Sequence, residues 1–440
     1  MKKGKCHSIP LHVREPSGVA RSCYPITSGV PVPRGVLMST DHVRLTNPSG
    51  DEIPLQVGSA ASWPDGSIKW MHLDFQVDLE ANEEKVYTVY FGGNVECAAF
   101  ESPLEVRDRG KRIDVVTGPL RFSVDKTRFQ MQDVGLDLSD SGSFEPIASE
   151  PAETFVELED LTVKLSGRYL AGLDDRCRVR VETAGPLRAE ICAEGWHRSE
   201  DGRASIPFAV RIVAYAGHSF LTAYHTFAIS ENPNEVFVKS LGFNIPVTLK
   251  GDLKYATSGR EIHQGTLNGA CTLYQDEYEH YTLTSGDTVA EGTQSGGWLD
   301  LNDGEKGVTL FVRDIDRLYP KALRVDESGA TAYLWPPQAG NLDLRLELTH
   351  PSPELEAFKQ AYPVLYRMSE HGGLTPEEAK KFFTDDTGRT AMGVAKTHEL
   401  VVYFHSGDHR DARCEEMARA FNIPLTGFVS PEWYVQTNVL

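Results

Sequence analysis

The sequence predicts a mainly β protein, in which a small N-terminal β-barrel is followed by a large antiparallel β-sandwich and a short helical C-terminal segment. Apolar and polar residues alternate with period two over long stretches such as 68–77, which is typical of half-buried strands. Turn-forming residues such as those at 64–66 (Pro-Asp-Gly) separate these stretches at short intervals, which favours hairpins over helix-crossed parallel strands. Helix signals occur only in the last quarter of the chain.

The first domain is expected over residues 1–98. It contains the alternating stretches 68–77 and 85–91, with turn signals at 47–50. Residues 92–104 are rich in glycine, alanine and polar residues, and we place the first domain boundary there. A block of short strands of this size is compatible with a small barrel.

The central domain is expected over residues 104–405. Residues 205–217 and 219–230 are two long apolar runs joined by one short turn, which predicts a large hairpin in the middle of a broad sheet. A β-sandwich is the simplest architecture that buries such a hairpin. Residues 136–153 predict an acidic loop within this domain.

Residues 406–440 are expected to form a helical segment. Residues 411–421 carry apolar side chains at helical spacing, and 375–378 (Thr-Pro-Glu-Glu) carry an N-cap, a proline at the first helical position and a glutamate three residues after the cap. Both patterns are typical of helix starts and amphipathic helices.

Composition limits the function. The 440 residues are 40% apolar and carry 44 Lys and Arg against 63 Asp and Glu, a net charge of −19. This sign disfavours nucleic acid or an anionic membrane as a partner of the whole surface. We find no export signal and no stretch long enough to cross a membrane, and the seven scattered cysteines are an odd number without a Cys-x-x-Cys pair, so we expect a cytoplasmic protein with reduced thiols.

Several familiar site motifs are absent. The sequence has no phosphate-binding glycine loop, no His-Glu-x-x-His zinc motif and no Gly-x-Ser-x-Gly nucleophile elbow. His405 and His409, with Asp408 and Asp411, have the spacing of metal ligands on a helix. Because Gly407 interrupts the stretch, we interpret it as a polar connecting loop, with a metal cluster as the alternative.

The most basic local stretch is residues 312–324. It contains Arg313, Arg317 and Lys321, together with Tyr319. Arginine can hold a sugar carboxylate with two parallel hydrogen bonds, and a positioned tyrosine or lysine can transfer a proton. The alternative is a loop whose charges are neutralised by its own aspartates.

Three further residues are candidates for sugar handling. His225 and Lys239 interrupt apolar strands, and histidine can act as a base near neutral pH, although a polar residue on the wet face of a strand explains the same pattern. Trp335, which precedes two prolines, could stack on a sugar ring, although tryptophan more often fills a core.

Short segments resemble a known family. Residues 26–35 (ITSGVPVPRG) and 63–70 (WPDGSIKW) resemble the N-terminal small-barrel domain of the rhamnogalacturonan exolyase-like (PcRglX/YetA-like) proteins. Residues further along resemble the central β-sandwich of that family in the same order; they are 215–217, 225–227, 312–314, 319–321 and 334–337. The resemblance covers residues from about 20 to 440.

The resemblance implies a RIFT-related barrel, a β-sandwich, a C-terminal α/α toroid, and cleavage of rhamnogalacturonan by β-elimination. Residues 430–434 resemble the start of the toroid, so we expect most of the toroid to be missing from these 440 residues and a separate toroid-domain chain to be a possible partner. The sequence itself requires no cofactor, so the cofactor stays open, with a divalent cation such as calcium as one alternative.

Chemistry suggests roles for the candidates in such a reaction. Arg313 would neutralise the uronate carboxylate, Lys321 or His225 would remove the proton next to it, and Tyr319 would protonate the leaving oxygen. We expect the remaining candidates to bind the acidic oligosaccharide; they are Trp335, Arg317 and Lys239.

Two other functions stay open. The chain could be a non-catalytic sugar-binding or scaffold part of a split or truncated lyase. It could also be a glycoside hydrolase, which would need two facing carboxylates, and the sequence does not select a pair among Asp300, Asp303, Asp314 and Asp316.

Overall fold

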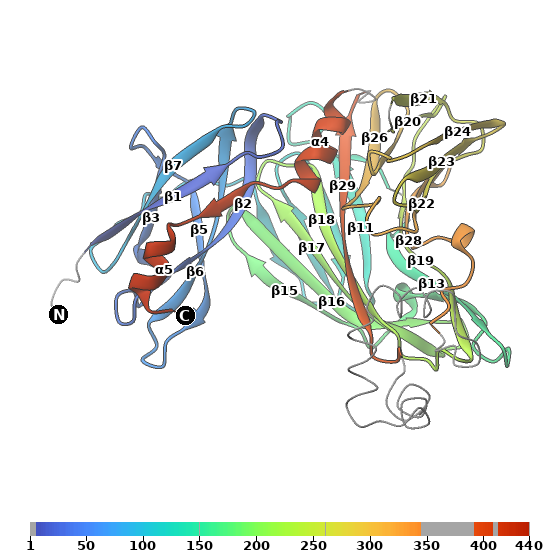
Figure 1. Cartoon of the computed structure of the whole chain (residues 1–440), viewed down its shortest axis with the longest axis horizontal. Helices are drawn as coiled ribbons and strands as arrows, with labels where there is room; N and C mark the ends of the chain where they lie inside the picture. Colours follow the sequence, from blue (N-terminus) through green and yellow to red (C-terminus); the bar gives the residue numbers. More distant parts are fainter. Residues whose placement is uncertain (1–5, 149, 260, 345–390, 408–411, 440) are drawn as a thin grey trace, which may run out of the picture.

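The computed structural model describes residues 6–148, 150–259, 261–344, 391–407 and 412–439. It is mainly β, as predicted. Figure 1 shows two lobes side by side, an N-terminal barrel and a larger sandwich. In the described part of the chain, no helix is long and apolar enough to cross a membrane. The predicted helix start at 375–378, together with His409, Asp408 and Asp411, lies outside the described residues.

The N-terminal barrel is made of two sheets. Their strand orders are β30-β1-β7-β3-β4 and β2-β6-β5. The alternation predicted at 68–77 is found in β6, where Met71, Leu73 and Phe75 are buried. The strands are β1 (His7–Arg14), β2 (Arg21–Pro31), β3 (Val43–Thr46), β4 (Glu52–Ile53), β5 (Leu55–Ser62), β6 (Ile68–Leu79), β7 (Glu84–Phe91) and β30 (Thr426–Phe428), and a 3₁₀ turn, η1, spans Thr40–His42.

The sandwich has two layers. In the first layer the strands pair in the order β15-β16-β17-β18-β29-β26-β25-β20-β21. These strands are β15 (Arg178–Ala184), β16 (Arg188–Arg198), β17 (Ala204–Tyr215), β18 (Phe220–Ala228), β29 (Ala395–Ser406), β26 (Lys306–Val312), β25 (Trp298–Asn302), β20 (Lys254–Ser258) and β21 (Ile262–Thr266). The predicted hairpin is present as β17 and β18, near the middle of this layer.

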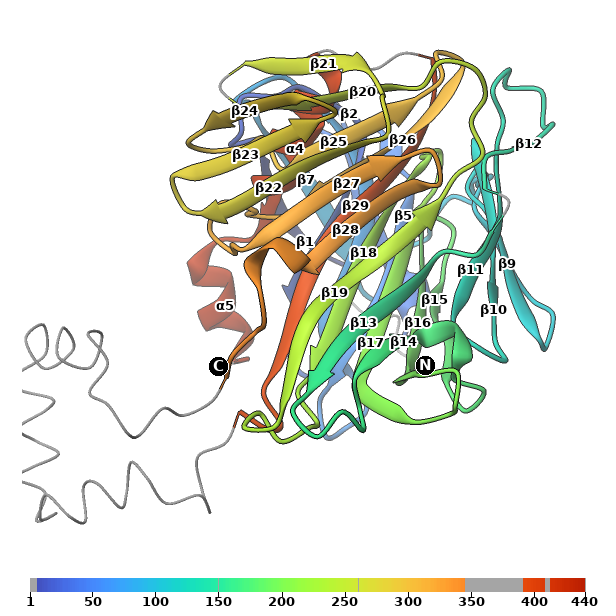
Figure 2. The same ribbon diagram turned by 90° about the vertical axis from the view of Figure 1, so that its right-hand side faces the viewer.

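The second layer pairs in the order β14-β13-β19-β28-β27-β22-β23-β24. Its strands are β13 (Glu153–Asp160), β14 (Gly167–Leu170), β19 (Val236–Pro246), β28 (Gly329–Trp335), β27 (Lys321–Asp326), β22 (Ala270–Glu277), β23 (His280–Ser285) and β24 (Thr288–Gly292). Figure 2 shows the strands of both layers running diagonally across the sandwich lobe. Short 3₁₀ turns, η2 (Ala171–Leu173) and η3 (Pro337–Ala339), follow β14 and β28.

A five-stranded sheet of its own covers one side of the sandwich (Figure 2). It consists of β8 (Glu105–Asp108), β9 (Arg112–Val116), β10 (Leu120–Asp125), β11 (Gln130–Leu136) and β12 (Glu145–Pro146). Its apolar side chains share one buried core with the sandwich strands, and the ring centroids of Phe129 and Phe208 are 5.8 Å apart.

The end of the chain returns to the barrel. Helix α4 (Ala412–Asn422) packs on the outer face of the first layer, where Cys414, Ala418 and Phe421 are buried. Strand β30 then pairs with β1, and helix α5 (Pro431–Thr437) begins after an N-cap formed by Ser430. The described C-terminal segment therefore contacts both lobes and holds the barrel and the sandwich together. The domain limits expected from the sequence stay predictions.

Candidate functional site

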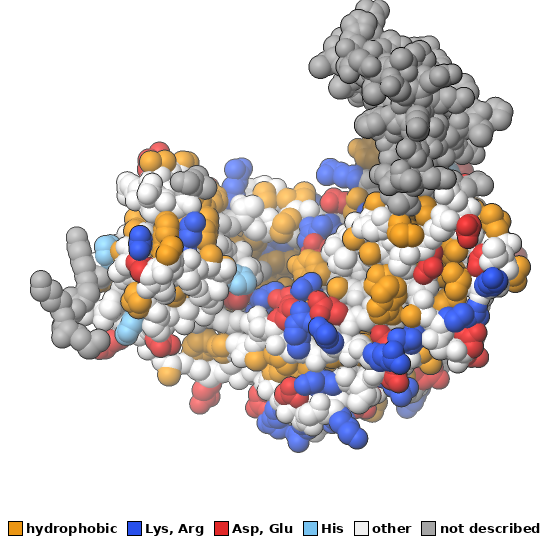
Figure 3. Space-filling view, turned by 90° about the horizontal axis from the view of Figure 1, so that it is seen from below, with side chains coloured by type: hydrophobic (Ala, Val, Ile, Leu, Met, Phe, Trp, Pro, Cys, Tyr) orange, Lys and Arg blue, Asp and Glu red, His pale blue; other side chains and the backbone are white. Residues whose placement is uncertain are grey.

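A groove with a volume of about 950 Å³ lies where the barrel meets the sandwich. Barrel strands β3 to β6 line one side of this interdomain groove, and the turn between β15 and β16 lines the other. Figure 3 shows a hollow between the two lobes on the face that it presents. Grooves between domains are preferred places for ligands because they are concave and combine side chains from two folding units.

Gln56 fixes the two sides of the groove to each other. Its side-chain oxygen accepts hydrogen bonds from the backbone N–H groups of Leu187 and Arg188, both at 2.9 Å, and its Nε2 donates to the Arg188 carbonyl at 3.1 Å. A Cβ atom on Gly185 would come within 2.0 Å of the Gln56 side chain. Glycine at 185 is therefore required for the barrel to dock in this way.

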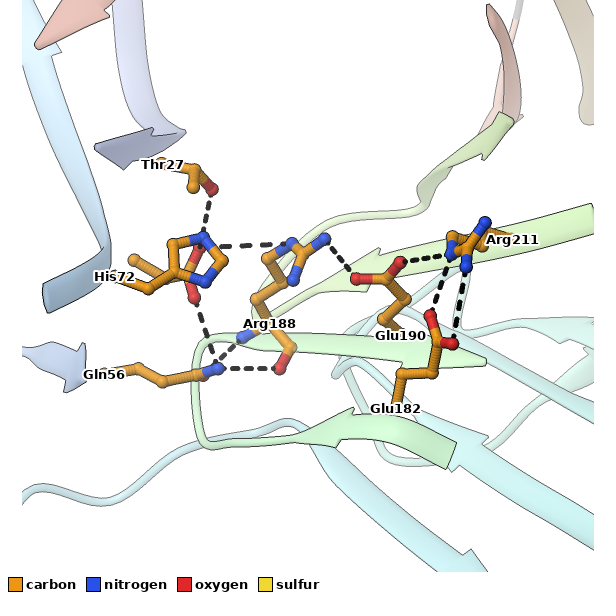
Figure 4. Close-up of polar contacts among 8 residues, drawn as sticks. Thr27, Gln56, His72, Glu182, Arg188, Glu190 and Arg211 are labelled. Atoms are coloured by element: carbon orange, nitrogen blue, oxygen red, sulfur yellow. Dashed lines mark hydrogen bonds and ion pairs between the residues drawn. The ribbon is translucent and has the colours of Figure 1, made fainter. Parts of the chain in front are cut away.

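A chain of alternating charges runs from the barrel across the sandwich strands (Figure 4). Arg188 Nε lies 3.9 Å from Asp74, and Arg188 Nη2 donates to Glu190 at 2.5 Å. Glu190 is 3.3 Å from Arg211, which also bonds Glu182 at 2.8 Å. Burial raises the pKa of Glu182, but Arg211 and Arg180 outweigh it and hold this pKa below its usual value. These charges are mutually satisfied, so they fix the wall of the groove.

Two groups in the groove are left available. One is His72, which lines the groove and whose side chain is 36% exposed. Its Nε2 lies 3.8 Å from the Asp74 carboxylate. Arg44 lies over the Tyr90 ring at 4.9 Å and makes no ion pair with any residue that the structure describes. A base with a carboxylate behind it, together with an uncommitted guanidinium, is an arrangement suited to an acidic sugar.

Arg313, predicted to hold a carboxylate, already binds one. It follows β26 on the outer face of the first layer, where it donates to both carboxylate oxygens of Glu399 at 2.6 and 2.8 Å. Its third nitrogen donates to the Phe421 carbonyl, and its guanidinium lies over the Phe421 ring. Arg313 therefore anchors helix α4 to the sandwich.

The predicted base Lys321 is buried in the sandwich, with 2% of its surface exposed. Its Nζ donates to the carbonyls of Leu318 and Pro320 at 2.6 and 3.0 Å, and burial together with the Lys396 charge lowers its pKa to about 7. Tyr319 and Arg317 lie beside it in sequence but are exposed, and Arg317 is 3.8 Å from Asp314.

His225 also lies inside the sandwich. It pairs across β18 and β29 with His398, and both ring nitrogens of His225 lack a hydrogen-bond partner among the described residues. Burial, with a contribution from His197, lowers the pKa of His225 to about 3. Lys321 interacts electrostatically with His398, so the fold brings Lys321 and His225 toward His398. Because Glu399 follows His398 in the strand and points to the opposite face, Arg313 is separated from both by the sheet.

The predicted sugar-binding residues lie apart from one another. Lys239 in β19 is exposed and lies 3.9 Å from Glu159. Trp335 ends β28 and donates from its indole nitrogen to the Gly340 carbonyl at 2.9 Å. Nothing in the chain's local patterns pointed to Arg44 or His72 as site residues, because each alternates within an ordinary strand; only the docking of the barrel on the sandwich brings them to one groove.

Within the described ranges, no group of three or more His, Cys, Asp or Glu side chains could hold a metal ion. His405, one of the histidines with metal-ligand spacing, is buried and its Nε2 lies 2.8 Å from an Asp300 oxygen.

Comparison with known families agrees with this architecture. Residues 15–89 match the PcRGLX-like N-terminal RIFT barrel domain, and residues 171–270 match the PcRGLX-like protein central beta sandwich domain. Two segments of the chain therefore resemble PcRGLX-like domains. The PcRGLX-like resemblance extends to the uncharacterized protein YetA of Bacillus subtilis (strain 168), which is 24% identical over 96% of this chain and 53% of the relative.

Solved structures share the fold. A glycosyl hydrolase family 38 protein from Enterococcus faecalis superposes with a TM-score of 0.50 at 12% identity, covering 96% of this chain and 47% of that one. An alpha-mannosidase from Enterococcus faecalis V583 gives a TM-score of 0.51 at 10% identity, with 96% and 46% covered. The chain thus spans about half the length of the relatives it matches. Its two domains point to a carbohydrate-related protein.

Proposed function

We propose that this chain binds uronate-containing oligosaccharides of the rhamnogalacturonan type in the interdomain groove and promotes their β-elimination there. One observation carries the proposal: the groove shared by the two PcRGLX-like domains is lined by both Arg44, which has no carboxylate partner among the described residues, and His72, a half-exposed imidazole. The fixed charges around them hold the groove in shape before a ligand arrives.

The chemistry requires charge neutralisation and a base. A uronate carboxylate repels the negative charge that develops when the neighbouring C–H proton is removed, so a guanidinium on the carboxylate lowers the barrier. In the proposal Arg44 binds the carboxylate and His72 takes the proton. The C–H electrons form the carbon–carbon double bond, the glycosidic C–O bond breaks, and the departing oxygen takes a proton from water.

The test is release of the unsaturated uronate, followed by its ultraviolet absorbance, from rhamnogalacturonan oligosaccharides and the 440-residue chain. His72→Ala is expected to lower turnover by about 10²–10⁴-fold, the usual contribution of a general base. Arg44→Gln is expected to lower it by about 10²–10³-fold, the usual effect of removing a group that stabilises developing negative charge. The matched controls are His12→Ala and Arg34→Gln, which remove a barrel histidine and a barrel arginine outside the groove lining. Full turnover by His72→Ala and Arg44→Gln would contradict the assigned roles.

A non-catalytic sugar-binding role is the second candidate. The burial of Lys321 and His225 and the ion pair of Arg313 favour it, because these groups were the catalytic candidates of the sequence and none of them faces the groove. Binding of the oligosaccharide without any unsaturated product from the wild-type chain would support this role over cleavage.

A further inference from the structure

A second groove lies on the outer face of strands β15 to β18, with a volume of about 620 Å³. We call it the Trp196 groove; its lining includes Arg176, Arg178, Trp196 and Ala209. The β15–β16 hairpin connects it to the interdomain groove, which is lined by the turn at residues 182–186. Arg178 and Glu182 are four residues apart in β15, which is about 13 Å along a strand.

The groove presents an aromatic platform. The Trp196 side chain is 41% exposed, and its strand neighbour is Pro207. Ala209 and Ala228 beside it are small, which leaves the groove open next to the indole. An exposed indole face covers the C–H side of a sugar ring, and its large apolar area at low conformational cost makes it an effective contact.

The strand that carries Trp196 is fixed by Asp174, which is 1% exposed. Asp174 accepts hydrogen bonds from the Trp196 amide at 2.9 Å and from Arg198 Nε at 2.7 Å. Burial raises the pKa of Asp174, but these bonds outweigh it and keep the pKa below its usual value. A Cβ at Gly195 would lie 2.7 Å from the same carboxylate. Glycine at this position therefore allows the loop that carries Asp174 to pack against the strand.

Two arginines of the groove are exposed and make no close ion pair. Arg198 is neutralised by Asp174, and Glu194 binds Arg180 at 2.7 Å. The Arg176 side chain is 82% exposed, and its ion pair with the equally exposed Asp175 is long, at 4.0 Å. Arg178 makes no ion pair within the described ranges. In a chain with a net charge of −19, two guanidiniums beside an exposed indole mark a local site for an anion that also has an apolar face.

We propose that the Trp196 groove is a second glycan-binding site, in which the indole stacks on a uronate ring while Arg178 and Arg176 bind its carboxylate. The choice of a uronate as ligand rests on the proposed function, whereas the groove itself is separate from the interdomain groove. An acidic oligosaccharide lying along the β15–β16 hairpin would contact both, so the Trp196 groove would hold the polymer while the interdomain groove acts on it.

The test is calorimetric titration of the whole chain with oligogalacturonate. Trp196→Ala and Arg178→Gln are each expected to weaken binding at least tenfold, and methyl-esterified oligogalacturonate, which has the same rings without charge, is expected to bind at least tenfold more weakly than the acid. Tyr278→Ala, which removes an exposed aromatic side chain outside the groove, is the matched control and should bind as the wild type does. Unchanged affinity of Trp196→Ala and Arg178→Gln, or equal binding of the methyl ester, would overturn the inference.

The two proposals can fail separately. Loss of product with His72→Ala, combined with unchanged oligogalacturonate affinity in Trp196→Ala, would leave the proposed function standing and remove the second site. Trp196-dependent binding without any product from the wild-type chain would establish the second site and remove the proposed cleavage.

Discussion

Arg313, directly after β26, faces Glu399 of β29 with two parallel hydrogen bonds, of 2.6 and 2.8 Å, between guanidinium and carboxylate. Both side chains are about one-fifth exposed. The pair lies under helix α4, whose last turn accepts a further bond from Arg313. Arg313 therefore has a structural role, because Glu399 of the same chain already supplies its carboxylate partner.

Replacing Glu399 with Gln is expected to destabilise the protein, because Arg313 would keep its partly buried charge without a full counter-charge. We expect a loss of roughly 1–3 kcal/mol in the free energy of unfolding, measured by denaturant titration, with unchanged oligosaccharide affinity. An affinity loss without a stability loss would instead assign Arg313 to ligand binding. The exposed pair Arg107–Glu105 is the control, for which Glu105→Gln should change stability little.

Lys321→Met tests both the burial and the sequence-predicted role of Lys321. The folded pKa is about 7 and the ordinary value is 10.5, so between these pH values the unfolded chain binds a proton that the folded chain lacks. Stability from this group therefore rises with pH in that window, by up to about 1.4 kcal/mol per pH unit, and the methionine variant should lose this slope. Lys239→Met, which removes an exposed lysine, should keep it.

The same variant decides the catalytic role predicted for Lys321. If Lys321 abstracts the substrate proton, Lys321→Met abolishes the unsaturated product even at a pH where it is fully folded. Our account, in which His72 is the base, expects product release by Lys321→Met to stay within a few-fold of the wild type.

His225→Leu is expected to make the protein less sensitive to acid. The folded pKa of His225 is about 3, below its ordinary value of 6.5, so the unfolded state gains a proton first as the pH falls below about 6.5. The wild type should therefore lose roughly 2 kcal/mol from this residue between pH 7 and pH 5, and the variant should not. Denaturant titrations at the two pH values measure the difference, and equal losses in both proteins would contradict the buried neutral state.

Gly185→Ala is expected to disturb the docking of the barrel. The added methyl group would meet the Gln56 side chain at 2.0 Å, which would displace it from its hydrogen bonds to Leu187 and Arg188. We expect a loss of roughly 1–3 kcal/mol. In the Gln56→Ala background the same substitution should cost clearly less, because the clash is gone; additive losses would argue against this contact.

Local patterns were enough to predict the fold class. Alternation in 68–77 and in the hairpin of β17 and β18 depends only on which face of a strand is buried, and this is visible in neighbouring residues. The return of β29 to a place between β18 and β26 could not be predicted, because more than 160 residues separate it from β18 and the pairing is set by the closing of the sandwich.

The candidate site was harder to predict for the same reason. The basic stretch around Arg313 and Lys321 is dense in charge, but charge density does not tell whether a side chain is ion-paired, buried or free. Arg313 is paired with a residue 86 positions later, and Lys321 points into the sandwich. Arg44 and His72 are isolated polar residues in barrel strands. They become candidate site residues only because the sandwich packs beside them and completes the groove.

An acidic oligosaccharide is expected to occupy the interdomain groove through its contact with Arg44. The most direct measurement is calorimetric titration of the 440-residue chain with a rhamnogalacturonan oligosaccharide, comparing the wild type with Arg44→Gln and the control Arg34→Gln. We predict saturable binding that Arg44→Gln weakens at least tenfold and Arg34→Gln leaves unchanged. Equal affinity of all three proteins would contradict the claim.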